Sequence, residues 1–112
     1  MTSDLPFEIS VEDVQQLIKS DEACLLLDCR QPEEYAIAHL ANSSLLPLQE
    51  ISERLHELEP NKQTRIVVYC HHGMRSEMVT AWLREQGFPF VQNMTGGIDA
   101  WSIKIDTSLP RY

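Results

Sequence analysis

Short apolar runs alternate with segments of helical spacing along this chain. β-branched and leucine-rich runs predict strands at 7–9, 25–28, 44–46, 66–69 and 90–93. Residues at helical spacing predict helices at 11–19, from Pro32 to Tyr35, from Ile51 through Leu55 and Leu58 to Pro60, from Met78 to Gly87, and near 98–102. Strands that alternate with helices are typical of βα units. The pattern therefore predicts an α/β fold, a three-layer α/β/α sandwich with a mainly parallel sheet of about five strands.

Local residues support several of these boundaries. Ser10 with Asp13 three positions later predicts an N-terminal cap for the first helix. Met78 and Trp82 lie four residues apart in the helix that ends at Gly87, so we expect both in the core, and we expect the same of Trp101.

The chain of 112 residues is expected to be one domain, 1–112, with the patterned core at about 9–102 and an aperiodic tail at 103–112. No apolar stretch reaches the length of about 18 residues that a membrane span needs, and residues 1–6 lack the pattern of a signal peptide. Three cysteines without a Cys-x-x-Cys motif argue against a disulfide framework and a zinc site. We expect a cytoplasmic protein without a metal or other cofactor.

The net charge of −8 limits which classes of partner we expect. Binding of nucleic acid requires clustered Lys and Arg, so it is not expected. A small cationic cluster of His71, His72 and Arg75 stands out against the acidic background, and such a cluster would attract a small anion.

Cys70 follows the apolar run Ile66–Tyr69 directly, and a helix begins a few residues later. Open α/β sheets bind ligands at the carboxyl ends of their strands. Free backbone N–H groups at a helix N-terminus favour anions and lower the pKa of a thiol. Cys70 is therefore predicted to be a thiolate nucleophile in an anion-binding loop, and the alternative is an inert buried cysteine.

Three segments together resemble the signatures of rhodanese-like domains and occur in the same order as in that family. They cover roughly residues 9–102. They are Asp28-Cys29-Arg30 with Pro32-Glu33-Glu34-Tyr35 and His39, then Cys70-x-x-Gly73-x-Arg75-Ser76, and finally Asn93 to Trp101 with Gly96-Gly97.

This resemblance implies a sulfurtransferase. Cys70 would take the outer sulfur of thiosulfate or a related donor as a persulfide and pass it to a thiol or cyanide, in ping-pong order. The implied partners are a small anionic donor and a thiol acceptor, such as a thioredoxin-like protein or a sulfur carrier. Alternatives on the same fold are a Cys-based phosphatase or arsenate reductase, and a non-catalytic module for sulfur relay or protein binding. Such phosphatases use Cys-x5-Arg, whereas only four residues separate Cys70 from Arg75.

The loop residues 71–76 are predicted to bind substrate. Gly73 would allow the tight turn that points backbone N–H groups inward, with Met74 and Ser76 completing the cradle. Arg75 has two candidate roles, binding the sulfonate of the donor and bracing the loop against a carboxylate. His71 and His72 would either raise the local positive potential or lie in solvent.

Four further residues are expected to support the loop. Asp28 and Arg30 would form an ion pair, with Glu34 as an alternative partner for Arg30, and Gly96 and Gly97 would let a second loop approach closely. His39 is expected to anchor the loop that leads to Leu46 through a hydrogen bond.

Cys29 also lies at the carboxyl end of a predicted strand. If its strand neighbours that of Cys70, the two sulfurs would lie close together. Similar cysteines in cell-cycle phosphatases can act as reversible disulfide partners, which suggests a Cys29–Cys70 disulfide on oxidation. The alternative is a small buried hydrophobic residue.

Overall fold

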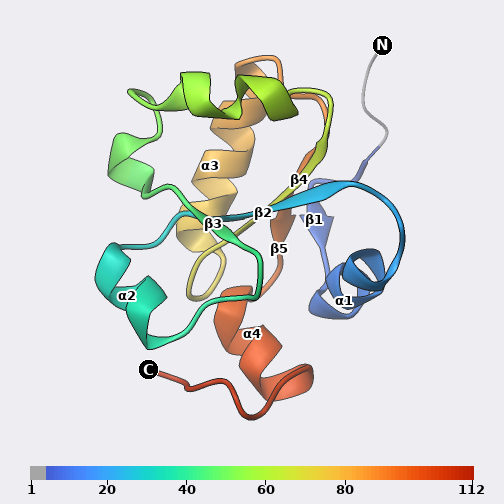
Figure 1. Cartoon of the computed structure of the whole chain (residues 1–112), viewed down its shortest axis with the longest axis vertical. Helices are drawn as coiled ribbons and strands as arrows, with labels where there is room; N and C mark the ends of the chain where they lie inside the picture. Colours follow the sequence, from blue (N-terminus) through green and yellow to red (C-terminus); the bar gives the residue numbers. More distant parts are fainter. Residues whose placement is uncertain (1–4) are drawn as a thin grey trace.

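The computed structural model describes residues 5–112 and contains one parallel sheet with helices around it (Figure 1). Residues 1–4, on which the signal-peptide prediction partly rests, lie outside the described part. The strands are β1 (Glu8–Ile9), β2 (Cys24–Asp28), β3 (Ser44–Leu45), β4 (Arg65–Tyr69) and β5 (Val91–Met94). The α-helices are α1 (Val11–Lys19), α2 (Pro32–Ile37), α3 (Met74–Glu85) and α4 (Gly97–Lys104), with 3₁₀ helices η1 (Leu48–Glu50) and η2 (Leu55–Asn61).

All pairings in the sheet are parallel, and the strand order is β1-β5-β4-β2-β3. The longest pairing joins the central strands β2 and β4, from Cys24 opposite Arg65 to Asp28 opposite Tyr69. Because both strands run the same way, the residues that follow them emerge side by side at one edge of the sheet. The predicted α/β fold with a parallel sheet of five strands is confirmed.

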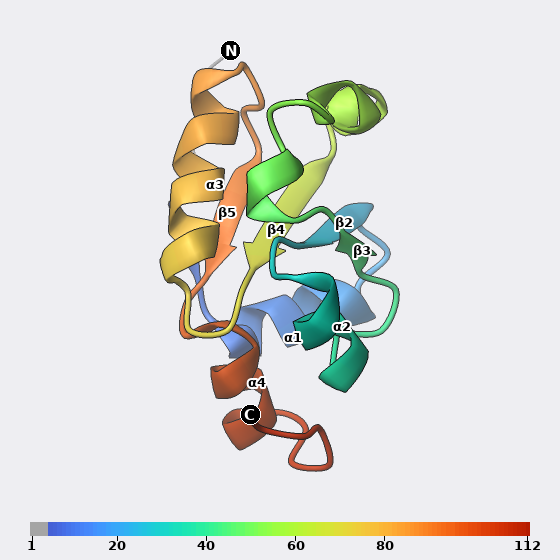
Figure 2. The same cartoon turned by 90° about the vertical axis from the view of Figure 1, so that its left-hand side faces the viewer.

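Two apolar cores lie on opposite faces of the sheet. Alternate residues of a strand point to opposite faces, so Val67 joins one core while Ile66 and Val68 join the other. The first core is built with α1 and α4, through Val14 and Trp101 among others. The second contains Leu83 of α3, and Figure 2 shows α3 alongside the sheet.

Most predicted boundaries agree with the structure to within a few residues. Helix α1 has the predicted range, and the Asp13 N–H donates to the Ser10 side chain at 3.1 Å. The single helix predicted from Ile51 to Pro60 is wrong, since the structure has turns at 51–54 followed by η2. Pro60 lies inside η2 and has no N–H for an α-helical hydrogen bond, which disfavours a regular α-helix.

The described residues include no helix that is long and apolar enough to cross a membrane.

Candidate active site

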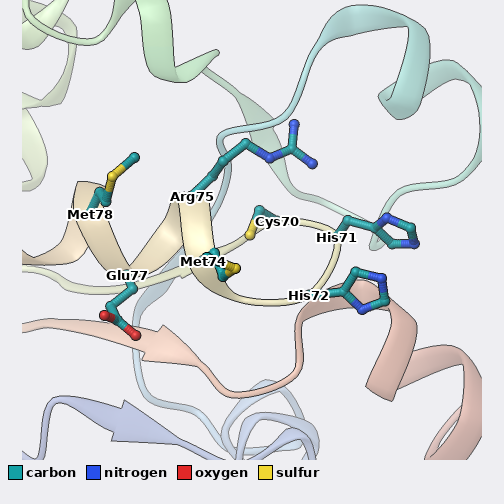
Figure 3. Close-up of a pocket in the computed structure, with 7 residues that line it drawn as sticks. All are labelled: Cys70, His71, His72, Met74, Arg75, Glu77 and Met78. Carbon is teal, nitrogen blue, oxygen red and sulfur yellow. The ribbon is translucent and has the colours of Figure 1, made fainter.

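Cys70 leaves β4 at the centre of the sheet and starts a short loop that ends in α3 (Figure 3). Gly73, the residue before the helix, has φ +106, a conformation that side chains rarely adopt. This turn carries the chain round the sulfur of Cys70. The Gly73 N–H donates to Sγ at 3.1 Å and the Ser76 N–H donates to it at 3.3 Å. The predicted inward-pointing N–H groups are therefore present.

These contacts favour the thiolate. The pKa of Cys70 is lowered from 9.0 to about 4, first by hydrogen bonding from the Cys29 thiol and then by Ser76 and Gly73, against the opposing effect of burial. The pKa of Cys29 is raised above its ordinary range by the same hydrogen bond and by burial. Cys70 is consequently the anionic partner at neutral pH, and Cys29 keeps its proton.

A chain of polar side chains continues from Ser76 to the sheet edge. Ser76 Oγ lies 3.3 Å from Cys70 Sγ and donates to Asn93 Oδ1 at 2.5 Å. The Asn93 amide donates in turn to both Glu8 carboxylate oxygens and to the Gly73 carbonyl. Ser76 has only one hydroxyl proton, which it donates to Asn93. The two backbone N–H groups are therefore the donors to the Cys70 sulfur that do not depend on rotation of the Ser76 hydroxyl. Sequence analysis named Asn93 only as the start of the third signature and missed Glu8 and its contact with Asn93, because only the β1–β5 pairing brings these two residues together.

The second glycine loop packs directly on the Cys70 loop, as predicted. The Ile98 N–H donates to the Cys70 carbonyl at 2.8 Å, and the Asp99 N–H donates to the His71 carbonyl at 3.1 Å. A Cβ on Gly97 would lie 2.4 Å from both carbonyl oxygens. Gly96, with φ +79, would place a Cβ 2.7 Å from the Ala100 Cβ. Both positions require glycine.

Arg75 braces the loop. Its guanidinium donates two hydrogen bonds to Glu34 of α2, at 2.6 and 2.9 Å. The pKa of Glu34 is lowered from 4.5 to about 2, chiefly by this hydrogen-bonded pairing. The structure thus shows the second of the two candidate roles of Arg75, and contact with a substrate stays a prediction. No sequence pattern singled out Glu34 as its partner.

Asp28 and Arg30 form the predicted ion pair at 2.6 Å, with both side chains fully buried. Arg30 also donates to the Ala38 carbonyl and to the Tyr112 hydroxyl, each at 2.6 Å. Tyr112 donates to Glu34 at 2.8 Å, so the tail links the Arg30 and Arg75 ion pairs. The aperiodic tail gave no sign of this contact in the sequence.

The two histidines of the loop are stacked, with ring centroids 4.0 Å apart, and the His71 ring also stacks on Tyr112. Both rings turn away from the sulfur of Cys70 in Figure 3. Burial lowers the pKa of His71, which favours its neutral form, while His72 is exposed and lies 3.8 Å from Asp99. A role for either ring in substrate binding remains a prediction.

The predicted role of His39 is wrong. Its ring stacks on Tyr35 and its Nδ1 lies 2.9 Å from the Tyr35 carbonyl, so His39 is held against the last turn of α2. The following loop is held by the Tyr69 hydroxyl instead, which accepts from the Leu40 N–H and donates to Ser43 Oγ.

A pocket of about 700 Å³ opens above the loop, lined by Cys70, His71, His72, Met74, Arg75, Glu77 and Met78 (Figure 3). Cys70 is only 1% exposed and lies at its base. The expectation that Met78 belongs to the core is wrong, because its side chain is 56% exposed and faces the pocket. Trp101 is buried and Trp82 packs against the core, as expected.

Cys29 lies beside Cys70, because Asp28 and Tyr69 are paired in the sheet and the cysteines are the next residues. The Cys29 N–H donates to the Tyr69 carbonyl at 3.2 Å. Cys29 is buried in the same core as Cys70, and both are free thiols. A disulfide between them stays a prediction, as does the alternative of a purely apolar role.

Among residues 5–112, no group of three or more His, Cys, Asp or Glu side chains is arranged to hold a metal ion.

Comparison with known proteins agrees with this geometry. The family model for the rhodanese-like domain matches residues 10–104. The chain belongs to the rhodanese-like domain family. This assignment covers the Cys70 loop, both supporting glycines and the Asp28–Arg30 pair.

Several relatives of this rhodanese-like chain are named for sulfur transfer. It is 34% identical over 104 residues to the thiosulfate sulfurtransferase GlpE of Coxiella burnetii, covering 90% of this chain and 92% of the relative. It is 36% identical over 95 residues to a sulfurtransferase of Allochromatium vinosum, covering 85% and 87%. It is 39% identical over 99 residues to a putative sulfur carrier protein, YrkF, of Bacillus subtilis, covering 88% of this chain and 52% of YrkF. The chain thus spans only about half the length of YrkF.

Solved structures share the fold. A rhodanese-related protein of Thermoplasma volcanium superposes with a TM-score of 0.76 at 30% identity, covering 98% of this chain and 96% of that chain. The human single-domain sulfurtransferase TSTD1 superposes with a TM-score of 0.77 at 23% identity, covering 89% and 98%, which shows the fold alone.

Proposed function

We propose that this protein transfers a sulfane sulfur from thiosulfate or a related donor to a thiol or cyanide, through a persulfide on Cys70. The observation that carries the proposal is a cysteine of low pKa, with two backbone N–H groups directed at its sulfur. Such a cysteine is a thiolate at neutral pH without a general base.

The reaction balances in two steps. The Cys70 thiolate attacks the outer sulfur of thiosulfate, the S–S bond of the donor breaks, and sulfite leaves with the bonding electron pair. The anionic persulfide keeps its outer sulfur close to the Gly73 and Ser76 N–H groups. An acceptor thiolate then attacks that outer sulfur, and the Cys70 thiolate is released as the leaving group.

Incubation with thiosulfate tests the first step. Intact mass should rise by about 32 Da, one sulfur per chain, with release of one sulfite. Cys70→Ser should abolish both changes, whereas Cys24→Ser, at the far end of β2, should keep them. Absence of the mass increase in the wild-type protein would exclude thiosulfate as the donor.

A phosphatase or arsenate reductase remains the competing enzyme class. Four residues separate Cys70 from Arg75, one fewer than in the Cys-x5-Arg loop of such phosphatases, and this shorter loop argues against that class. We expect no turnover of p-nitrophenyl phosphate or arsenate. A sulfur-relay module would instead load Cys70 from a protein persulfide and leave thiosulfate unused.

A further inference from the structure

Helix α3 presents an unusual exposed face beside Cys70. Met74 and Met78 are 80% and 56% exposed, and both line the pocket that contains Cys70. Ala81 is exposed one turn further on. At 3.6 residues per turn these three residues share one side of the helix. Met side chains are unbranched and adapt to the shape of a partner, so this stripe is suited to contact with another molecule.

Two carboxylates lie on the same side of the helix. Glu77 and Glu85 are exposed and form no ion pair with any residue that the structure describes. Together with Met74, Met78 and Ala81 they fall within an arc of about 100° around the α3 axis. We name these five residues the α3 face. It combines an apolar centre with negative charge.

Among the described residues that line the pocket, no free arginine or lysine charge offsets Glu77, and Arg84 beside Glu85 is turned to the carbonyls of Val91, Leu5 and Pro6. Arg75, whose guanidinium is paired with Glu34, is the only arginine or lysine among the lining residues. His71 is turned away from the sulfur and stacked between His72 and Tyr112. The face is therefore complementary to a cationic and partly apolar partner.

The position of Cys70 limits how such a partner can react. Its sulfur lies at the base of the pocket, and the side chain of a cysteine is short, so the backbone that carries an acceptor thiol must come close to α3. The helix from Met74 to Glu85 is about 16 Å long, which matches about five residues of extended chain.

From this arrangement we infer that the α3 face docks the sulfur acceptor. This acceptor is a polypeptide segment that has a reactive cysteine, an apolar residue and basic residues within about five positions. The cysteine would lie near Met74, the apolar side chain over Met78, and the basic side chains opposite Glu77 and Glu85. This inference rests on the proposed sulfur transfer and specifies its second step.

The test uses three acceptors: 2-mercaptoethanol, a peptide with one cysteine, one leucine and two lysines, and the same peptide with glutamates in place of the lysines. Cys70 is first loaded with thiosulfate, and loss of the added sulfur is followed by mass. We expect the lysine peptide to discharge the persulfide about tenfold faster than the glutamate peptide, with a difference that shrinks as salt is added. Equal rates for the two peptides would overturn the inference and leave the proposed function intact.

Variants locate the surface. Met78→Ser and Glu85→Lys should each lower the ratio of the lysine-peptide rate to the 2-mercaptoethanol rate severalfold. The matched controls are Ile18→Ser and Glu12→Lys on α1, which packs in the core on the opposite face of the sheet. Equal effects of the α1 and α3 variants would contradict the location.

A second measurement does not depend on persulfide formation. Peptides with serine in place of cysteine are titrated into the unloaded protein, and binding is followed by fluorescence anisotropy. Tighter binding of the lysine peptide, weakened by Met78→Ser but not by Ile18→Ser, supports docking even if thiosulfate fails to load Cys70. Equal binding of both peptides under those conditions would refute the inference.

Discussion

Removal of the Cys29 thiol should make Cys70 a weaker acid. Cys29→Ala deletes the neighbouring thiol, which lies 3.6 Å (Sγ to O) from the Tyr69 carbonyl and lowers the pKa of Cys70. The N–H groups of Gly73 and Ser76 remain in place. The change therefore isolates one donor among several.

The expected magnitude follows from the energy of such a contact. A hydrogen bond to a charged group contributes about 1.5–3 kcal/mol, which corresponds to about one to two pKa units. The pKa of Cys70 should rise from about 4 to about 5–6. At pH 5 the thiolate fraction would then fall from about 90% to between about 10% and 50%. At pH 7 both proteins would be almost fully ionised, so the difference should vanish there.

The assay is thiolate absorbance at 240 nm against pH, together with the rate of alkylation by iodoacetamide. Burial raises the pKa of Cys24 to about 11, and the pKa of Cys29 is higher still, so only Cys70 among the three cysteines should titrate below neutral pH. Cys29→Ser, which keeps a donor of similar size, should stay nearer the wild-type midpoint. Cys24→Ala is the control without a contact to Cys70.

An unchanged midpoint in Cys29→Ala would refute this reasoning. It would show that the backbone N–H groups and the start of α3 are sufficient to stabilise the thiolate. A midpoint that falls would mean that Cys29 destabilises the anion, the opposite sign to the one expected.

Three further outcomes are expected. Gly97→Ala should lower the free energy of unfolding, measured by urea denaturation, by about 3 kcal/mol or more, because its Cβ would overlap two carbonyl oxygens. The control is Gly87→Ala, whose Cβ would meet only the Lys62 side chain at 3.4 Å, and its free energy of unfolding should fall by less. Glu34 has a lowered pKa, so its pairing with Arg75 stabilises the fold above pH 4.5, and this stabilisation is lost as the pH falls toward 2. The free energy of unfolding, measured by urea denaturation, should fall by about 1–2 kcal/mol over this range, and this loss should be absent in Glu34→Gln. Dilute peroxide should lower the count of free thiols by two per chain, because it forms a Cys29–Cys70 disulfide. A loss of only one thiol, or a loss of two thiols in Cys29→Ala as well, would argue against this disulfide.

Much of the fold was predictable because its causes are local. Short runs of three or four residues marked the strands, and Ser10 marked the start of α1 through a contact three residues away. The segment 48–61 was not predictable in this way. Its apolar spacing suits an α-helix, but Pro60 and the docking of Ile51 and Leu58 on the core favour short 3₁₀ turns.

The features of the candidate site also fall into two groups, those set by neighbours in the sequence and those set by tertiary contacts. Sequence alone placed Cys70 after a strand and before a helix, gave Gly73 its turn, and paired Asp28 with Arg30, because each of these depends on neighbours within a few residues. Tertiary structure decided that Arg75 pairs with Glu34, that Tyr112 joins both ion pairs, and that Met78 faces the pocket instead of the core. These contacts join residues up to 82 positions apart, and their geometry is set by how the parallel strands bring separate loops to one edge of the sheet. No local pattern records that arrangement.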